Sequence, residues 1–148
     1  MKGIREFLDC KKIAVAGVSR KKGAFSVTVA EHLESLGYEV ARINPNFQKG
    51  RDSLNEYSTI SELPSDFERV IVLTNSKNSA DVVSAITEKG IKQIWIQQKS
   101  ENSEVMNMLA SYDCNLVWGR CIFMFTNPKG IHKFHYSLSK FFGRVPSE

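Results

Sequence analysis

The sequence predicts an α/β fold, in which a doubly wound parallel sheet of about five strands is covered by helices. One observation is that several short runs are almost entirely apolar and β-branched, such as "IAVAGV" (13–18) and "RVIVLTN" (69–75). Such runs are typical of strands buried on both faces. The other is that helical patterns of ten to fifteen residues separate these runs, which indicates βαβ units.

Each element follows from a local pattern. The amino terminus (1–12) has its apolar residues on one side of a short helix, and Gly37 and Gly90 end two longer helices in the way that C-terminal glycines do. The segment 48–68 is the least regular, with a short helix or strand expected around 57–63. The expected strands are 13–18, 38–44, 69–75, 92–97 and 115–118, and the expected helices are 1–12, 25–36, 76–89 and 101–112.

The carboxyl-terminal segment has a separate helical pattern. Apolar side chains recur along one face from residue 128 until Gly143, which predicts an amphipathic helical extension (128–145). We expect it to pack on the domain or on a second copy of the chain, as a homo-oligomer would. The chain is therefore expected to form one domain (1–148) with its core at about 11–122. The residues of the apolar face are Ile131, Phe134, His135, Leu138, Phe141 and Phe142.

Composition excludes several classes of protein. The 148 residues carry a net charge of +4, which suits an anionic small ligand, but no block of Lys and Arg indicates a nucleic-acid partner. The three cysteines form no CxxC pair, which argues against a disulfide framework or a zinc site and favours a reducing cytoplasm. No apolar run approaches the roughly 18 residues that would predict a membrane span.

The loop after the first strand, within "IAVAGVSRKKGAF" (13–25), has the composition of a phosphate site. In the dinucleotide pattern GxGxxG, glycines make the turn, let the pyrophosphate approach, and let helix pack on strand. Here Gly17 makes the turn, but Ser19 and Lys22 take the places of the second and third glycines. A hydroxyl and free backbone N–H groups at a helix N-terminus can still hold phosphate, and Arg20 adds positive charge.

The end of the second strand argues against NAD. An NAD site uses an Asp or Glu there to bind the ribose hydroxyls, whereas this strand ends in Asn44, Pro45 and Asn46, and Arg42 is basic. We therefore expect a heavily phosphorylated, adenine-nucleotide-like ligand other than NAD. The alternative is that the basic loop is an ordinary solvated loop.

These residues resemble a known family. "VAGVSRKKGAFSVTVAEHLESLGYEVARINPN" looks like the opening of the small stand-alone CoA-binding proteins, which are similar to the CoA-binding N-terminal domain of the succinyl-CoA synthetase α subunit. The later segments "TISELP", "WIQ" and "GRCI" agree in order, so the resemblance covers about 11–122. It implies a Rossmann-like fold that binds coenzyme A or an acyl-CoA. The segment "QQKSEN" (97–102) and the aromatic extension depart from the family pattern.

The resemblance also implies a set of site residues. The loop after the first strand would hold phosphates, the end of the second strand would border the adenosine, and the end of the third would line the pantetheine side or the adenine pocket. In that order these residues are Gly17, Val18, Ser19, Arg20 and Lys22; Asn44 and Pro45; Thr74 and Asn75.

One further candidate is Cys121, which follows the fifth strand beside Arg120. A neighbouring guanidinium can lower a thiol pKa and make the cysteine reactive, for example toward the CoA thiol. The alternative is a small buried cysteine beside an apolar strand.

Nothing in the sequence indicates catalysis. His132 and His135 lie three apart on the predicted carboxyl-terminal helix, but no third metal ligand is near them, and His32 is expected at the surface. No Ser/His/Asp pattern or carboxylate pair stands out. We therefore expect a binding protein that senses, carries or regulates. The alternatives are an NADP-dependent oxidoreductase, suggested by Arg42, and an interaction module with a vestigial nucleotide site.

Overall fold

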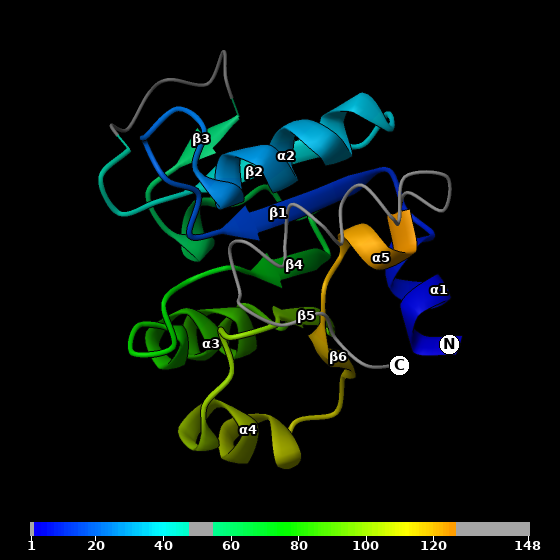
Figure 1. The fold of residues 1–148 in the computed structure, drawn as a ribbon. Helices are drawn as coiled ribbons and strands as arrows, with labels where there is room; N and C mark the ends of the chain where they lie inside the picture. Colours follow the sequence, from blue (N-terminus) through cyan, green and yellow to red (C-terminus); the bar gives the residue numbers. More distant parts are fainter. Residues whose placement is uncertain (1, 48–54, 127–148) are drawn as a thin grey trace.

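A computed structural model describes residues 2–47 and 55–126 of the chain (Figure 1). Over these residues the strands form one parallel sheet in the order β3-β2-β1-β4-β5-β6. The strands are β1 (Lys12–Ala16), β2 (Glu39–Ile43), β3 (Glu56–Tyr57), β4 (Arg69–Val72), β5 (Gln93–Gln97) and β6 (Asn115–Arg120). The helices are α1 (Lys2–Leu8), α2 (Phe25–Ser35), α3 (Ser79–Glu88), α4 (Ser103–Ala110), α5 (Phe123–Thr126) and the 3-10 turn η2 (Ile60–Glu62).

The predicted fold class is confirmed, and the strand number is corrected from five to six within the described residues. The additional strand, β3, consists of two residues that pair with Arg42 and Ile43 of β2. Two residues cannot show an alternating pattern, so the sequence indicated only a short helix or strand around 57–63. That segment contains η2 and the second residue of β3. The short helix α5 was also not predicted. The predicted carboxyl-terminal helix lies outside the described residues.

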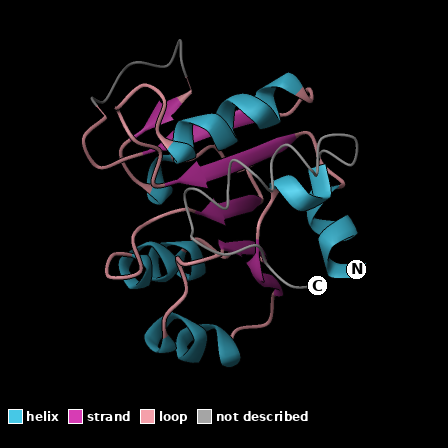
Figure 2. Cartoon of the chain, viewed as in Figure 1, coloured by secondary structure: helices cyan, strands magenta, loops and turns pink. Residues whose placement is uncertain are grey.

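The sheet separates two apolar layers, each covered by helices (Figure 2). Along β1, Ile13 and Val15 pack on the side of α1, α2 and α5, while Ala14 and Ala16 pack on the side of α3, α4 and η2. All four side chains are fully buried, which explains why this strand is continuously apolar in sequence.

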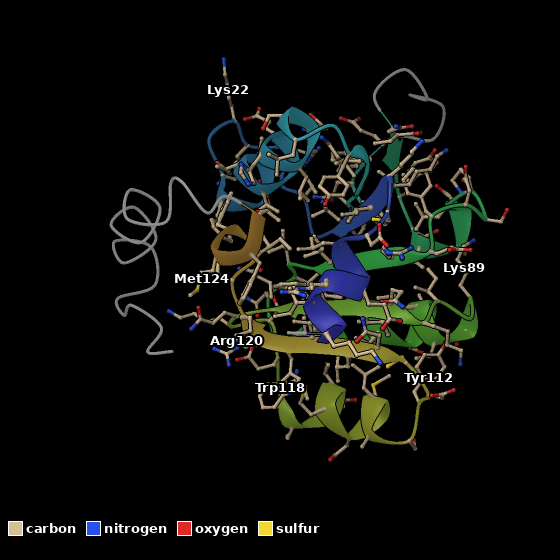
Figure 3. The ribbon with its side chains drawn as sticks, turned by 90° about the vertical axis from the view of Figure 1, so that its right-hand side faces the viewer. Lys22, Lys89, Tyr112, Trp118, Arg120 and Met124 are labelled. Carbon is tan, nitrogen blue, oxygen red and sulfur yellow. The ribbon has the colours of Figure 1, made fainter. Side chains whose placement is uncertain are left out.

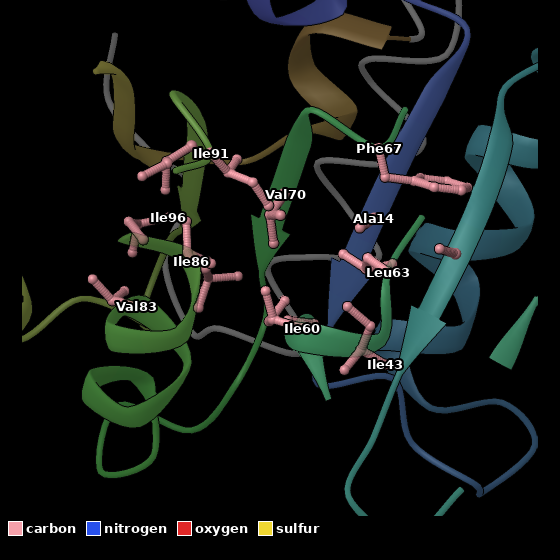
Figure 4. Close-up of a cluster of buried hydrophobic side chains, with 14 of the residues drawn as sticks. Ala14, Ile43, Ile60, Leu63, Phe67, Val70, Val83, Ile86, Ile91 and Ile96 are labelled. Atoms are coloured by element: carbon pink, nitrogen blue, oxygen red, sulfur yellow. The ribbon is translucent and has the colours of Figure 1, made fainter. Parts of the chain in front are cut away.

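Figure 4 shows the second layer, where Ile86 of α3 and Ile60 of η2 lie against β4 and β2. Small alanines on β1 and larger isoleucines and valines on the helices and neighbouring strands fill this layer together. Complete burial of such a branched side chain stabilises the fold by about 1.5–3 kcal/mol. These two layers hold the strands rigidly, and so they position the loops that follow the strands.

Candidate functional site at the carboxyl edge of the sheet

The strand order places a crevice beside the end of β1. The chain leaves β1 to cover one face of the sheet with α2, and it leaves β4 to cover the opposite face with α3. The loops after these two neighbouring strands therefore diverge at the edge to which the arrowheads of β1 and β4 point in Figure 1. Ligands of doubly wound sheets bind at such a point, where the strand order reverses.

Gly17 makes the turn out of β1. Its φ of +95° is one that residues with side chains rarely adopt, and an added Cβ would lie 2.9 Å from the backbone nitrogen of Thr74. The backbone N–H groups of Gly17 and Val18 both donate to the carbonyl of Ile43 at the end of β2, at 2.9 and 3.1 Å. The turn is thus held against the ends of both neighbouring strands.

The loop then leads into an open helix N-terminus. The Ser19 N–H donates to Ser26 Oγ at 2.8 Å, and Ser19 Oγ accepts from the Lys21 N–H at 3.0 Å. The N-cap residue of α2, Ala24, provides no side-chain cap, and the first turn of α2 contains no acidic residue. The first N–H groups of a helix have no partner within the helix, and together with the positive end of the helix dipole they can hold a phosphate.

A cavity of about 360 Å³, the α2 pocket, adjoins this helix end. Within the described part of the chain, Arg20 and Lys22 form no ion pair, and Figure 3 shows Lys22 extending away from the ribbon. Arg42, by contrast, is paired with Glu34, whose carboxylate oxygens both lie 3.0 Å from Arg42 Nη2. The lining residues are Ser19, Arg20, Lys22, Val27, Arg42, Asn46, Phe47 and Glu56.

A larger cavity of about 600 Å³, the α3 pocket, lies over the ends of β1, β2 and β4. Asn44 forms its wall, but its amide is engaged: Nδ2 donates to the Val18 carbonyl and Oδ1 accepts from the Asn46 N–H, each at 2.8 Å. Asn44 therefore shapes the crevice by joining two loops. The lining residues are Ala16, Gly17, Ile43, Asn44, Pro45, Asn46, Ser58, Thr59, Ile60, Leu73, Thr74, Asn75, Asn78, Asp81, Val82 and Ala85.

The start of α3 forms another wall of the α3 pocket. Ser79 Oγ donates to the Asn75 carbonyl at 3.2 Å, so Thr74 Oγ1, 2.8 Å away, donates to Ser79 Oγ. Asn75 Oδ1 accepts from the Lys77 N–H at 3.0 Å. Asp81 stands in the first turn of α3. Of the described residues that line this pocket, none is Lys or Arg.

The structure brings eight of the ten predicted site residues to these two pockets. Ser19, Arg20 and Lys22 line the α2 pocket. Gly17, Asn44, Pro45, Thr74 and Asn75 line the α3 pocket. Asn46 lines both, so the two cavities adjoin there. Val18 and Cys121 line neither; Val18 is 1% exposed and belongs to the core.

Of the two interpretations of Cys121, the structure supports the small buried cysteine and contradicts a thiol whose pKa Arg120 lowers. Cys121 is 2% exposed, and burial raises the pKa of its thiol. Arg120 is exposed, whereas Cys121 belongs to the apolar layer that also contains Phe123. Arg120 at the end of β6 thus faces solvent, and Cys121 directly after it faces the core. The Arg120 guanidinium does not contribute to the change in the pKa of Cys121.

His32, which was expected at the surface, is less exposed than that expectation implies. Its side chain is half-buried between α2 and α5, with Nε2 2.9 Å from Thr126 Oγ1 and its ring centroid 4.9 Å from that of Phe123. Burial lowers the pKa of the imidazole. The contact was not predictable because α5 itself was not predicted.

Sequence reasoning missed other lining residues, notably Phe47, Glu56, Ser58 and Asp81. Asp81 had a detectable signal, because an acidic residue in the first turn of a helix that follows a strand lies near the carboxyl edge of the sheet. Phe47 follows β2, Glu56 lies in β3 and Ser58 follows β3, and no local sequence pattern reveals the position of these three residues.

Residues 2–47 and 55–126 contain no group of three or more His, Cys, Asp or Glu side chains that could hold a metal ion. Across the same ranges, every helix is too short or too polar to cross a membrane.

The sheet order and the crevice at its switch point define a Rossmann-like domain. Comparison with known proteins specifies the family: the chain belongs to the CoA binding domain family, which its residues 11–127 match.

The chain is also similar to other proteins over most of their length. Uncharacterized protein YneT of Bacillus subtilis is 27% identical over 120 residues, which cover 80% of this chain and 88% of YneT. Two solved structures of hypothetical proteins are also similar. One, from Pyrococcus furiosus, is 29% identical with a TM-score of 0.71 and covers 77% of this chain and 97% of its own. The other, from Pyrococcus horikoshii, is 28% identical with a TM-score of 0.72, and the match covers 83% of this chain and 87% of that protein.

Proposed function

We propose that this protein binds coenzyme A or an acyl-CoA in the crevice, with phosphate groups in the α2 pocket. The observation that carries the proposal is the N-terminus of α2, which has no side-chain cap and no acidic residue in its first turn. It follows a loop in which Arg20 and Lys22 form no ion pair with any residue that the structure describes. Coenzyme A carries a diphosphate and a ribose phosphate, which such a surface complements. Membership of the CoA binding domain family supports the same ligand.

The proposed role is binding for sensing, transport or regulation rather than catalysis. Of the described residues that line the two pockets, none is His or Cys, so these residues contain no Ser–His or Cys–His pair for nucleophilic catalysis. Cys121 and the half-buried His32 lie in the apolar layer beside α5 instead. The lining residues suit recognition of a ligand by hydrogen bonds and charge.

Ser19→Glu tests the proposed site. The substitution places a negative charge at the α2 pocket, so we expect calorimetric titration to show CoA affinity reduced at least tenfold, about 1.4 kcal/mol. Ser111→Glu makes the same change at the exposed end of α4 and is expected to leave the affinity unaltered. CoA binding that survives Ser19→Glu undiminished would place the ligand elsewhere.

An NADP-dependent oxidoreductase is the second candidate, because Arg42 lines the α2 pocket and could face a ribose phosphate. Arg42 already donates hydrogen bonds to Glu34, so fewer of its N–H groups are available for a ribose phosphate. This favours CoA over NADP, whose recognition would depend on Arg42. Titration with NADPH and with dephospho-CoA separates the two. Binding of NADPH without binding of CoA would support the oxidoreductase.

A further inference from the structure

The strand β6 forms one edge of the sheet, because among the described strands it pairs only with β5. The Asn115 N–H donates toward β5, to the Lys92 carbonyl at 2.8 Å. Backbone groups alternate in direction along a strand, so the N–H and C=O groups of Leu116 and Trp118 point away from β5. Within residues 2–47 and 55–126 no hydrogen bond to these outward groups is found. Such an edge is a template for pairing with another strand.

Two apolar side chains lie on one face of this edge strand. Leu116 and Trp118 are two residues apart and therefore share the face of the sheet that α3 and α4 cover. Leu116 packs against that layer, whereas Trp118 is 54% exposed, more than any other large apolar side chain of the described residues (Figure 3). Tryptophan is enriched among the residues that carry binding energy between proteins. Its exposure on an unpaired strand edge therefore indicates a docking surface.

A bulge limits the length of strand that can pair. Gly119 has a φ of +66° and is the extra residue where the register with β5 shifts between Ile96 and Gln97. Bulges twist a sheet edge and restrict pairing along it. This bulge follows Trp118, so the outward groups of Leu116 and Trp118 belong to the regular part of β6. We therefore expect a short contact.

The charges at the two ends of this segment identify the partner. Asp113 precedes β6 and Arg120 ends it, and both side chains are exposed. Among the described residues, neither forms an ion pair. In an antiparallel pair of two identical strands, the start of each strand lies beside the end of the other. The acidic start and the basic end therefore complement a second copy of this chain.

We propose that two copies of this chain associate through β6, in antiparallel orientation about a two-fold axis at Val117, so that their sheets become continuous. This register keeps corresponding faces of the two sheets on the same side. It places Trp118 of each copy opposite Leu116 of the other, and an aromatic and an aliphatic side chain in such positions stabilise each other. It also brings Arg120 of each copy close to Asp113 of the other.

The backbone supports the same register. Because the N–H and C=O groups of Leu116 and Trp118 point outward, each Leu116–Trp118 pair exchanges both N–H···O hydrogen bonds. The contact is isologous and closes after two copies. None of the described residues that line the α2 and α3 pockets belongs to β6. Both crevices therefore stay open in the dimer, and the inference does not depend on the proposed function.

Sedimentation equilibrium of the full chain, at concentrations from micromolar to millimolar, tests the inference. We expect a reversible monomer–dimer equilibrium in the wild type. Trp118→Thr keeps a strand-forming side chain but removes the aromatic contact, and we expect at least tenfold weaker association. The matched control is Leu36→Thr, which removes another exposed apolar side chain, at the end of α2. It is expected to leave the association unchanged.

Charge reversal gives a second test that leaves the apolar surface intact. Arg120→Glu and Asp113→Lys each place like charges at the contact, so each variant alone should associate more weakly. The double variant restores opposite charges, and its association should return toward that of the wild type. Variants that only destabilise the fold would not recover in this way, and thermal unfolding of each variant checks that the fold is retained.

A wild-type chain that stays monomeric at the highest concentration would overturn the inference. A dimer that Trp118→Thr and both charge reversals leave intact would also overturn it, because that dimer would use a surface other than β6. Either result leaves the proposed function untouched, since the contact uses no residue of the two pockets.

Discussion

At the residue scale, Gly17 has two separate reasons to be glycine. One is its positive φ, and the other is the approach of the Thr74 backbone to within 2.9 Å of an added Cβ. Gly23, in the same loop, has a positive φ of +81° but open space around its Cβ position. A comparison of Gly17 with Gly23 therefore separates the cost of the backbone conformation from the cost of the steric contact.

Gly17→Ala is expected to destabilise the protein more than Gly23→Ala does. The positive φ costs roughly 1–3 kcal/mol in either variant, and only at Gly17 must the β1 and β4 ends also move apart. Urea unfolding measures both free energies. Because the displaced strand ends form the crevice, Gly17→Ala should also weaken CoA binding. Equal destabilisation of the two variants would show that the contact with Thr74 is relieved without cost.

At the element scale, one imidazole contributes a hydrogen bond to the contact between α2 and α5. Thr126 Oγ1 donates to the Ile122 carbonyl at 3.0 Å, so it accepts from His32 Nε2, which must carry the proton. Because burial lowers the pKa of His32 in the folded protein, the unfolded chain binds a proton at higher pH than the folded one. Stability from this group is full above the unfolded pKa of about 6.5 and is lost as the pH falls through it.

His32→Gln should reduce this pH dependence, since glutamine keeps an N–H donor but does not titrate. Between pH 7.5 and 5.5 the wild type should lose up to about 1.4 kcal/mol of stability per pH unit more than the variant. Urea unfolding at several pH values measures the difference, and titration of all other groups is common to both proteins. Identical pH profiles would show that His32 is protonated in the folded state without penalty.

At the scale of the whole molecule, the crevice joins loops from β1, β2, β3 and β4, so a ligand there couples to global unfolding. Coenzyme A at a hundredfold excess over its Kd should stabilise the fold by about 2.7 kcal/mol. For a chain of this size the expected rise in Tm is roughly 5–10 °C. Thermal unfolding with and without CoA provides the measurement.

The Ser19→Glu variant at the same CoA concentration serves as the control for this shift. Its Tm should rise by no more than a few degrees, because the tenfold loss of affinity lowers the linkage energy to about 1.4 kcal/mol. An equal rise in both proteins would indicate that CoA stabilises the fold from a different site.

The sequence by itself determined the features that arise from neighbouring residues. The β-branched runs at 13–18 and 69–75 become β1 and β4, because burial on both faces leaves an unbroken apolar pattern. The basic loop and its glycine turn were also recognisable, because they combine a required backbone conformation with charge at a helix N-terminus. The α/β class and the residues of the β1–α2 loop were accessible for this reason.

Only the tertiary structure decided what depends on strand order and on facing direction. β3 exists only through its pairing with β2. Because β2 also pairs with β1, Glu56 of β3 and Phe47 after β2 reach the α2 pocket. Cys121 faces the core although its neighbour Arg120 is exposed. Asp81 faces the crevice because α3 follows the strand next to β1 on the opposite face of the sheet from α2. Contacts between residues far apart in the chain are set by packing, and no local pattern encodes them.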